Sequence, residues 1–569
     1  MNIDKIISAI KDKNSIVACD TETVSLIDKS LVAFSVCIDG ESYAFFTGMK
    51  YIKNISKEDQ DKLINAILST SGVIYHNYAY DGLVWAYNGY GKQIEPHDTL
   101  LISHLCNEVE SHKLKDLVLK YCNYQMIKFK EVCGTGKKQI SFSEVTDEVQ
   151  AHRYSSDDAL YTYKLYKVLI KKLNESTLRC YEDIERPLLN VILDMHVAGV
   201  PINKAKIDKI RLTCTDKVAD YEQQMKYYLG KTNINSPKQL RKYFIEKKHM
   251  PVIKQTKTGA ISMDTEVLEE YQKLGSIEAK LILGYRKYNK MLTTFVPALT
   301  PGEDGKIYPG YRQNGTTSGR LSCAKPAFQT IPKDDEFNIR DCIEAIPGYT
   351  LVGADFSQME LRLAAHYSQD TNLMSVYEQG LDIHKTTMDA VGCSRRQAKC
   401  VNFSILYGIG VRALAENLET NIQEAKLYMY KYHQNYPGLA RMVHSTTKQL
   451  LKDGYITLHG GRQRHISENF PYKTDWERKA ELRSISNALI QGAGANIMKE
   501  AMIIMSKKLA TLDAYLIATI HDEVIVMCRD NIVEQVKKIV EDSMLEPTKV
   551  FSVPFLVNVQ SGQTWANIH

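Results

Sequence analysis

The chain has 569 residues, a formal net charge of +5, 44% hydrophobic residues and 24% charged residues. This length exceeds what one hydrophobic core supports, so we expect two to four domains of ordinary globular composition. The composition excludes a long disordered tract, and the small net charge means that nucleic-acid binding would need local basic surfaces.

The cysteines and the N-terminus bear on the compartment. The 12 cysteines are scattered and include no CxxC pair, which argues against a zinc ribbon or a thioredoxin-like motif and favours a reducing compartment. The first segment, MNIDKIISAIKDKNS, lacks the apolar region of a secretory signal. No uncharged run approaches the roughly 20 residues that span a bilayer. We therefore expect a cytoplasmic protein with no membrane partner.

Strand-like and helix-like segments alternate over residues 1 to about 170. Strands are predicted at 16–23 (IVACDTET) and 73–80 (VIYHNYAY), and helices at 59–68 and 157–173. This alternation predicts an α/β domain. From about 175 to 300 the pattern is mostly helical. A loop rich in Pro and Gly follows, and beyond 345 strands mix with long helices, which predicts an α+β part.

Acidic residues in the first domain recur at spacings that bring them together. Asp20 and Glu22 end an apolar strand, where alternation places both on one face. Two further pairs are four residues apart and would each share a helix face: Asn77 with Asp81, and Tyr154 with Asp158. Taken singly, each carboxylate is more simply a cap or a solvated turn. Converging, the four suit two divalent cations and phosphodiester hydrolysis.

The ordered set DTE, NxxxD and YxxxD resembles the proofreading 3′→5′ exonuclease domain of DNA polymerases, an RNase H-like fold, over roughly residues 10–170. No carboxylate of that motif is missing, so the resemblance implies an active exonuclease. The implied metal ligands are Asp20, Glu22, Asp81 and Asp158. Tyr154 would position the attacking water as a catalytic residue, and Leu26 and Asn77 would lie near the 3′ end of the DNA.

A basic and aromatic stripe is predicted on a helix further along the chain. Its members recur every four residues: Arg395, Lys399, Phe403 and Tyr407. Ser394 is the predicted N-cap, and Gly408 and Gly410 mark the end. The order suits a nucleoside triphosphate, with phosphates on the cations and the sugar and base against the rings. An ordinary amphipathic helix, with solvated charges and buried rings, explains the helix alone equally well.

Three further carboxylates lie in two apolar stretches on either side of this helix. Asp355 ends a strand-like run, and Asp522 and Glu523 lie at the tip of a hairpin-like run. Carboxylates at strand ends suit hard cations. The order DFSQMELR, DIHK, RRQAKCVNFSILYG and IHDEV is that of motifs A, B and C of family A DNA polymerases, which the chain resembles from about residue 175 to its end.

The two resemblances imply an α/β and α+β multidomain protein. An RNase H-like exonuclease domain would cover 1–173, and a right-hand polymerase domain 174–569. Within the latter, the thumb would cover about 205–300 and the fingers about 376–449. The palm would cover about 174–204, 301–375 and 450–569.

The polymerase resemblance also implies roles for individual residues. Asp355 and Asp522, with the carbonyl of Phe356, would hold two Mg²⁺ ions about 3.5–4 Å apart, with Mn²⁺ as a possible substitute. Glu523 would support them, or act as a structural partner. The dNTP would meet Gln358, Glu360, His384, Arg395, Lys399, Phe403 and Tyr407. Lys399 would also protonate the leaving group.

Further implied roles concern the sugar and the DNA. Glu360 and Tyr407 would exclude a ribose hydroxyl, and Phe403, in place of Tyr, implies discrimination against dideoxynucleotides. DNA contacts are expected from Arg320, Gln329, Arg483, Asn487, Gln491 and His521, although a polar helix face also explains part of this set. For four thumb cations a solvated face explains the pattern as well as phosphate contact: Lys238, Arg241, Lys254 and Lys257.

The chain departs from the bacterial enzymes in three ways. The exonuclease motif starts at residue 20, so no 5′-nuclease domain is expected. Only ten residues separate His384 from Arg395, which predicts a trimmed fingers tip. No long thumb insertion is seen, so a thioredoxin processivity factor is not expected, and any other factor stays unassigned.

We therefore expect a monomeric, template-directed DNA polymerase with proofreading that binds primer-template DNA and dNTPs. Its expected role is phage DNA replication, in a bacterial cell or phage-infected host. A cellular or organellar repair or replication polymerase is the alternative. A single-subunit RNA polymerase and an inactive DNA-binding remnant fit the carboxylate sets less well.

Overall fold

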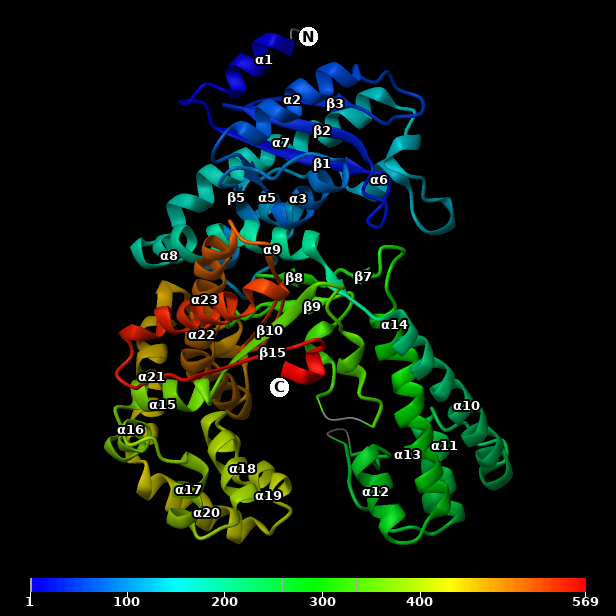
Figure 1. The fold of residues 1–569 in the computed structure, drawn as a ribbon, viewed down its shortest axis with the longest axis vertical. Coiled ribbons are helices and arrows are strands. Elements are labelled where there is room, and N and C mark those ends of the chain that lie inside the picture. The colour runs from blue at the N-terminus through cyan, green and yellow to red at the C-terminus, as the bar shows by residue number, and fades with distance from the viewer. Residues whose placement is uncertain (1–2, 257–258, 334–335, 569) are drawn as a thin grey trace. The chain divides into compact units, whose positions relative to one another are not determined.

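The computed structural model describes residues 3–256, 259–333 and 336–568. It divides into two compact units (Figure 1). Unit 1 comprises residues 1–198, 310–323 and 352–561, and unit 2 comprises 199–309, 324–351 and 562–569. No helix within the described ranges is both long and apolar enough to cross a bilayer.

A five-stranded mixed sheet forms the N-terminal part of unit 1. Its order is β3-β2-β1-β4-β5, with β1 antiparallel to β2 and parallel to β4. The strands are β1 (Val17–Thr23), β2 (Leu31–Ile38), β3 (Glu41–Phe46), β4 (Ile74–Tyr75) and β5 (His97–Asp98). β2 is buried throughout, and α7 (Glu148–Leu169) packs against β1, β2 and β3 (Figure 1). The remaining helices are α1 (Ile3–Ile10), α2 (Lys57–Ser69), α3 (Tyr78–Tyr87), α4 (Thr99–Cys106), α5 (Leu114–Cys122) and α6 (Phe129–Cys133).

The strand predicted at 73–80 is wrong beyond Tyr75. The chain turns at Asn77, whose φ is 75°, and α3 begins at the next residue. The cause is Asp98, whose carboxylate accepts the backbone N–H groups of Asn77 and Tyr78, both at 2.9 Å. This distant carboxylate satisfies amides that a strand would have used in the sheet. The helix predicted at 157–173 is confirmed but begins earlier, at Glu148.

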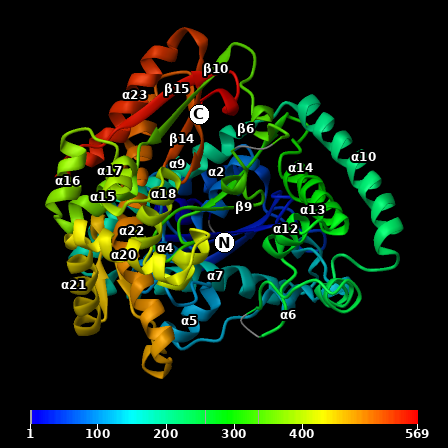
Figure 2. The ribbon, with the colours of Figure 1, turned by 90° about the horizontal axis from the view of Figure 1, so that it is seen from below.

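A second sheet holds the middle and the end of the chain together. Its order is β13-β14-β10-β15, and the last three strands run side by side (Figure 2). They are β10 (Tyr349–Phe356), β13 (Ala514–Ile520), β14 (Glu523–Arg529) and β15 (Val557–Gly562). Helices α9 (Arg186–Ala198), α22 (Asp475–Leu509) and α23 (Val533–Leu545) pack on this sheet, and α15 (Met359–Ser368) packs on α22.

Helices make up most of the rest. In unit 1 they are α8 (Glu175–Cys180), α16 (Thr371–Glu378), α17 (Ile383–Val391), α18 (Arg395–Leu406), α19 (Val411–Asn417), α20 (Ile422–Asn435) and α21 (Pro437–Asp453), with the short hairpin of β11 (Tyr455–Thr457) and β12 (Gln463–His465). In unit 2 they are α10 (Lys204–Leu229), α11 (Pro237–Arg241), α12 (Thr265–Lys273), α13 (Ile277–Lys290) and α14 (Val296–Ala298). Short strands complete the chain: β6 (Val200–Pro201), β7 (Lys306–Ile307), β8 (Gly310–Arg312) and β9 (Ser322–Ala324). In unit 2, α10 and α13 run side by side (Figure 1).

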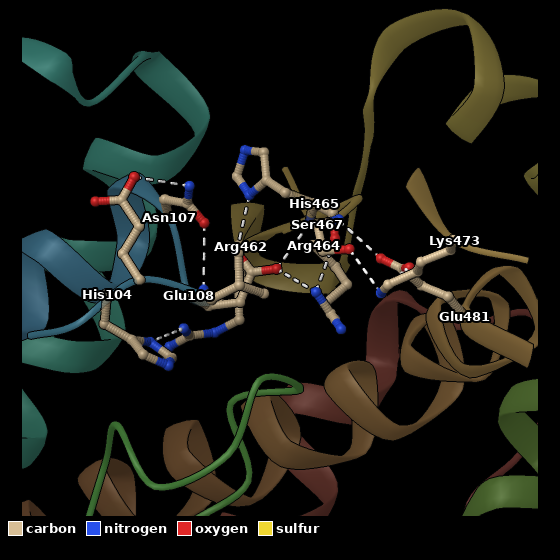
Figure 3. Close-up of polar contacts among 11 residues, drawn as sticks. His104, Asn107, Glu108, Arg462, Arg464, His465, Ser467, Lys473 and Glu481 are labelled. Atoms are coloured by element: carbon tan, nitrogen blue, oxygen red, sulfur yellow. Dashed lines mark hydrogen bonds and ion pairs between the residues drawn. The ribbon is translucent and has the colours of Figure 1, made fainter. Parts of the chain in front are cut away.

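A buried ionic cluster ties the residue directly before α9 to α22 and to the loop between β11 and β12. Glu185 accepts from Lys499 Nζ and Arg462 Nη2, both at 2.5 Å, and all three side chains are 1% exposed. Burial alone would raise the pKa of Glu185, but Lys499 and Arg462 outweigh it and hold that pKa below its ordinary value. Arg462 also lies 3.0 Å from His104 of α4 (Figure 3). The cluster therefore links α4 of the N-terminal part to α22, which packs on the second sheet.

Replacing Glu185 by glutamine should destabilise the protein strongly. The change keeps the shape but leaves two buried cations without their anion, for which a loss of about 3–5 kcal/mol is expected. Urea unfolding followed by circular dichroism would measure it. Glu58→Gln, which removes an exposed i,i+4 pair with Lys62, is the control and should cost under about 0.5 kcal/mol. Equal urea midpoints for both variants would contradict the role given to Glu185.

Candidate functional site

Three carboxylates meet where β1 faces α7. One oxygen each of Asp20, Glu22 and Asp158 can lie within 4.8 Å of the other two, and no other such group of three occurs in the described ranges. Burial raises the pKa of Asp20 and of Glu22, and repulsion from Asp158 adds to it. Burial likewise raises the pKa of Asp158 to about 7. Its Oδ1 is buried with no hydrogen-bond partner. Hard oxygen donors crowded in this way fit a divalent cation.

Tyr154 lies one helical turn before Asp158 on α7, as predicted. Its hydroxyl accepts from Lys115 Nζ at 3.4 Å, and the same ammonium lies 4.3 Å from the ring centroid. Burial raises the pKa values of Asp20, Glu22 and Asp158, and the positive charge of Lys115 acts in the opposite direction and lowers them. Lys115 therefore supplies the positive charge nearest to the carboxylate cluster, and sequence reasoning missed it because nothing in HKLKDL distinguishes one lysine from the next.

Asp81, Asn77 and Leu26 lie outside this group of three. The Asp81 carboxylate accepts from the Thr21 hydroxyl at 2.6 Å, and burial raises its pKa to about 8. Thr21 alternates with Asp20 and Glu22 along β1, so it extends from the opposite face. Asn77 sits in the left-handed turn before α3, and the Leu26 side chain is 79% exposed. Metal ligation by Asp81 and DNA contacts by the other two stay predictions.

Asp355 lies on β10, and Asp522 directly precedes β14, the strand next to β10 in the second sheet. β10 lies next to β14, and the Phe356 N–H donates to the Asp522 carbonyl at 3.3 Å. Asp522 lies in the tight turn between β13 and β14. Burial raises its pKa and the charge of Glu360 adds to this, against His521 and Arg320. Glu523 follows as a buried residue of β14, 5% exposed. The donors are all oxygens, which Mg²⁺ prefers.

Glu360 and Tyr407 contact each other directly. The Tyr407 hydroxyl donates to Glu360, and Arg320 forms an ion pair with the same carboxylate. Burial and this bond raise the pKa of Tyr407. Gln358, in a left-handed conformation just before α15, accepts from the Tyr377 hydroxyl at 3.3 Å. Arg320, predicted to contact DNA, is thus also engaged by Glu360.

The stripe on α18 forms as predicted, with Ser394 as a capping-box N-cap, although α18 ends at Leu406 and Tyr407 is its C-cap. The Phe403 and Tyr407 rings stack at 6.4 Å between centroids, and the Phe403 ring lies 6.1 Å from His384. Lys399 is exposed beside them.

Asp382 is a functional candidate that sequence reasoning passed over. It caps α17 by accepting the His384 N–H at 2.8 Å, and it pairs with Arg395 at 2.6 Å. His384 is mostly buried, which lowers its pKa, and its Nδ1 lies 3.1 Å from the Asn402 amide nitrogen. An incoming phosphate would have to replace Asp382 as the partner of Arg395. The motif DIHK contains this signal.

The predicted DNA contacts fall into two groups. On α22, the Asn487 amide donates to the Tyr407 carbonyl at 2.6 Å, and the Arg483 side chain lies beside Gly408. Gln491 follows on the same helix, and His521 is exposed in the β13–β14 turn with a φ of 57°. Gln329 belongs to unit 2. All these roles stay predictions.

The thumb cations are only partly available. Lys254 pairs with Asp264 at 3.2 Å and also with Glu266, and Arg241 donates to the Ile261 carbonyl at 3.0 Å. Lys238 lies on α11 and is exposed. Lys257 lies outside the described residues.

Two family models match successive parts of this chain. A family model described as DNA polymerase family A matches residues 204–567, and one described as 3′-5′ exonuclease matches residues 2–174. DNA polymerase I of Pseudomonas aeruginosa is 31% identical over 493 residues, covering 83% of this chain and 54% of the relative. That of Caldicellulosiruptor bescii is 36% identical over 425 residues, covering 70% and 49%. The chain thus spans about half the length of these curated relatives.

A solved structure has the same fold. It is the POL domain of Pol1 from M. smegmatis, in complex with DNA primer-template and dNTP. The TM-score is 0.87 at 24% identity, with 100% of this chain and 98% of that chain covered. The expected multidomain α/β and α+β fold class is confirmed.

Proposed function

The chain belongs to DNA polymerase family A and carries a 3′→5′ exonuclease domain, and from this we propose that it extends a primer on a DNA template and proofreads the product. The observation that carries the proposal is the presence of two separate acidic centres. One joins β1 to α7, and the other joins β10 to the β13–β14 turn. The second centre lies in the sheet that contains β10. β10 leads into α15, and α15 carries Glu360, which contacts Tyr407; the first centre has no such neighbour among these residues.

Each centre would hold divalent cations through its own carboxylates. At the first we assign Asp20, Glu22 and Asp158, with Asp81 as the fourth proposed ligand. At the second we assign Asp355, Asp522 and the Phe356 carbonyl, with Glu523 as support. Bound Mg²⁺, or Mn²⁺, would activate the attacking oxygen and neutralise phosphate charge.

The chain's own residues position the substrates of the second centre. Lys399 and Arg395 would bind the triphosphate of a dNTP, and Lys399 would also donate a proton to the leaving group. His384 and Phe403 would pack against phosphate and base. We assign the domain boundaries as expected from the sequence, with exonuclease residues 1–173 preceding the polymerase residues.

Primer extension on a recessed template, with and without a 3′ mismatch, tests both activities together. We expect extension in Mg²⁺, removal of the mismatch before extension, and neither in EDTA. DNA binding without Mg²⁺-dependent extension would instead favour an inactive DNA-binding remnant.

Glu360 is proposed to select deoxyribonucleotides, because a ribose hydroxyl would clash with it or leave its partly buried carboxylate unsatisfied. Glu360→Ala should therefore lower the preference for dNTP over rNTP by about 100-fold. Single-nucleotide incorporation with each triphosphate measures it. Glu378→Ala, an exposed change on α16, should leave the preference unchanged. Equal use of both triphosphates by the unchanged protein would favour an RNA polymerase.

The biological context is also a proposal. We infer phage DNA replication, with a cellular or organellar polymerase as the alternative. Loss of phage DNA synthesis in infected cells that produce only an Asp355→Ala chain would support the first. Undiminished phage synthesis together with sensitivity of the host to DNA damage would support the second.

A further inference from the structure

Two large aromatic side chains extend into solvent just before and within the first turn of α22. Tyr472 is 90% exposed and Trp476 is 67% exposed. A single exposed aromatic side chain is ordinary. Two of them four residues apart, beside a helix that carries predicted DNA contacts, require a closer look at what surrounds them.

The segment that carries these rings is firmly held. The Ser467 N–H donates to Glu481 at 2.7 Å, and Lys473 Nζ donates to the Ser467 hydroxyl at 2.9 Å and to Glu481 at 2.7 Å (Figure 3). A capping box between Thr474 and Glu477 starts the helix. The backbone that carries the two aromatic rings is therefore held in place by these contacts, which lowers the conformational entropy lost when a ligand binds the rings.

The base itself is anchored to the first domain. His465 Nδ1 lies 2.8 Å from Glu108, and Arg464 donates to the same carboxylate at 2.6 Å (Figure 3). Glu108 is 5% exposed. Its partners keep its pKa below its ordinary value although burial raises it. The segment before α22 is thus bonded to Glu108 of the first domain and to Glu481 of α22 itself.

We call the contact between Glu360 and Tyr407 the nucleotide gate. Arg483 and Asn487 form a stripe of α22 beside Tyr407 and Gly408, and Trp476 continues this stripe. At about 100° per residue, Trp476, Arg483 and Asn487 fall within about 40° of one another around the helix. Asn487 contacts the Tyr407 carbonyl, and Arg483 lies beside Gly408. Trp476 is two turns further on, about 10 Å along the helix axis. Lys479 lies between them on the same side and is exposed.

The path of α22 past the proposed catalytic residues bears on which DNA strand the stripe would meet. Deeper in the fold, Gly494 of α22 packs on Met359, which belongs to the same motif as Asp355. From Gly494 toward its N-terminus, α22 therefore passes from the motif that carries Asp355, past the Glu360–Tyr407 gate, to Trp476 and Tyr472. Template bases beyond the gate have not yet been copied, so they are unpaired and their faces are free to stack.

We propose that Tyr472 and Trp476 form a stacking platform for the unpaired template strand ahead of the nucleotide gate. The proposal rests on the proposed function. Aromatic rings stack on every base, so the platform would hold the template without reading its sequence. The distance of about 10 Å corresponds to about three stacked nucleotides.

Binding of hairpin primer-templates with overhangs of one or six nucleotides tests the proposal. Measurements on the full chain in EDTA keep both centres inactive. We expect the unchanged protein to bind the six-nucleotide overhang more tightly. A Tyr472→Ala/Trp476→Ala double variant should lose about tenfold on the long overhang and little on the short one. The Tyr472→Phe/Trp476→Phe variant, which keeps both rings, should retain the preference. 2-Aminopurine three positions ahead of the gate should be quenched by the unchanged protein and not by the double alanine variant.

Controls separate the possible outcomes. Tyr51→Ala, which removes a 68% exposed tyrosine of the first domain, should change neither affinity, and thermal unfolding checks that each variant is folded. Equal losses on both overhangs, or none, would overturn the proposal. A loss confined to a mismatched primer 3′ end would assign the rings to the primer strand and overturn it too. Absence of primer extension by the unchanged protein would refute the proposed function. The binding comparison, which is made in EDTA, would still show whether the two rings contact the overhang.

Discussion

Asp355→Ala should abolish primer extension and leave 3′→5′ degradation of single-stranded DNA intact. Asp355 is the second-to-last residue of β10, and the N–H of Phe356, which ends the strand, donates to the carbonyl of Asp522 in the β13–β14 turn, so the two acidic residues lie at one end of the second sheet. Removing this proposed metal ligand takes away a negative charge that would hold the two cations, and without the cations the triphosphate charge is not neutralised. We expect a loss of about a thousandfold or more, corresponding to about 4 kcal/mol in the barrier. Rapid-quench incorporation of one dNTP measures it.

The control for this prediction is Asp453→Ala, an exposed carboxylate at the end of α21, which should extend primers normally. Degradation by Asp355→Ala should proceed at the rate of the unchanged protein, because none of the ligands proposed for the first centre comes from the second sheet. If the variant lost both activities while its thermal unfolding stayed normal, the two centres would not be independent.

Local sequence patterns predicted the elements that carry the two centres. Alternation placed Asp20 and Glu22 on one strand, and spacing placed Tyr154 and Asp158 on one helix, because each judgement needs only a few neighbouring residues. The hairpin before Glu523 and the N-cap at Ser394 followed from equally local signals. The assignment of these elements to a polymerase and an exonuclease came from the resemblance of whole ordered motifs.

Contacts between distant segments could not be predicted. The turn at Asn77 depends on Asp98, 21 residues later. The pairing of Arg395 with Asp382 depends on how α17 packs against α18, and Lys115 meets Tyr154 only because α5 lies on α7. The Glu185 cluster joins residues more than 270 positions apart. Such partners become visible only once the chain is folded, since spacing along the sequence carries no information about them.

Asp20→Asn should remove exonuclease activity by about a thousandfold or more while primer extension continues. Asp20 is one of the three carboxylates whose oxygens lie within 4.8 Å, and the change keeps its shape while removing its charge. Release of a radiolabelled 3′ nucleotide from single-stranded DNA measures the loss. Asp4→Ala, an exposed change on α1, should degrade DNA normally.

The same variant should be more stable than the unchanged protein when metal is withheld. Burial raises the pKa of Asp158 to about 7, against about 4 in an unfolded chain. The folded state therefore binds more protons than the unfolded state between these values, and stability falls as pH rises through that window. Asp20→Asn removes one of the repelling charges, so in EDTA its thermal midpoint should lie above that of the unchanged protein at pH 8 and by less at pH 5.

Mg²⁺ should raise the midpoint of the unchanged protein and have little effect on the variant, because the ion offsets the repulsion that the amide has already removed. A variant that is less stable in EDTA at pH 8 would show that Asp20 serves the fold rather than a cation.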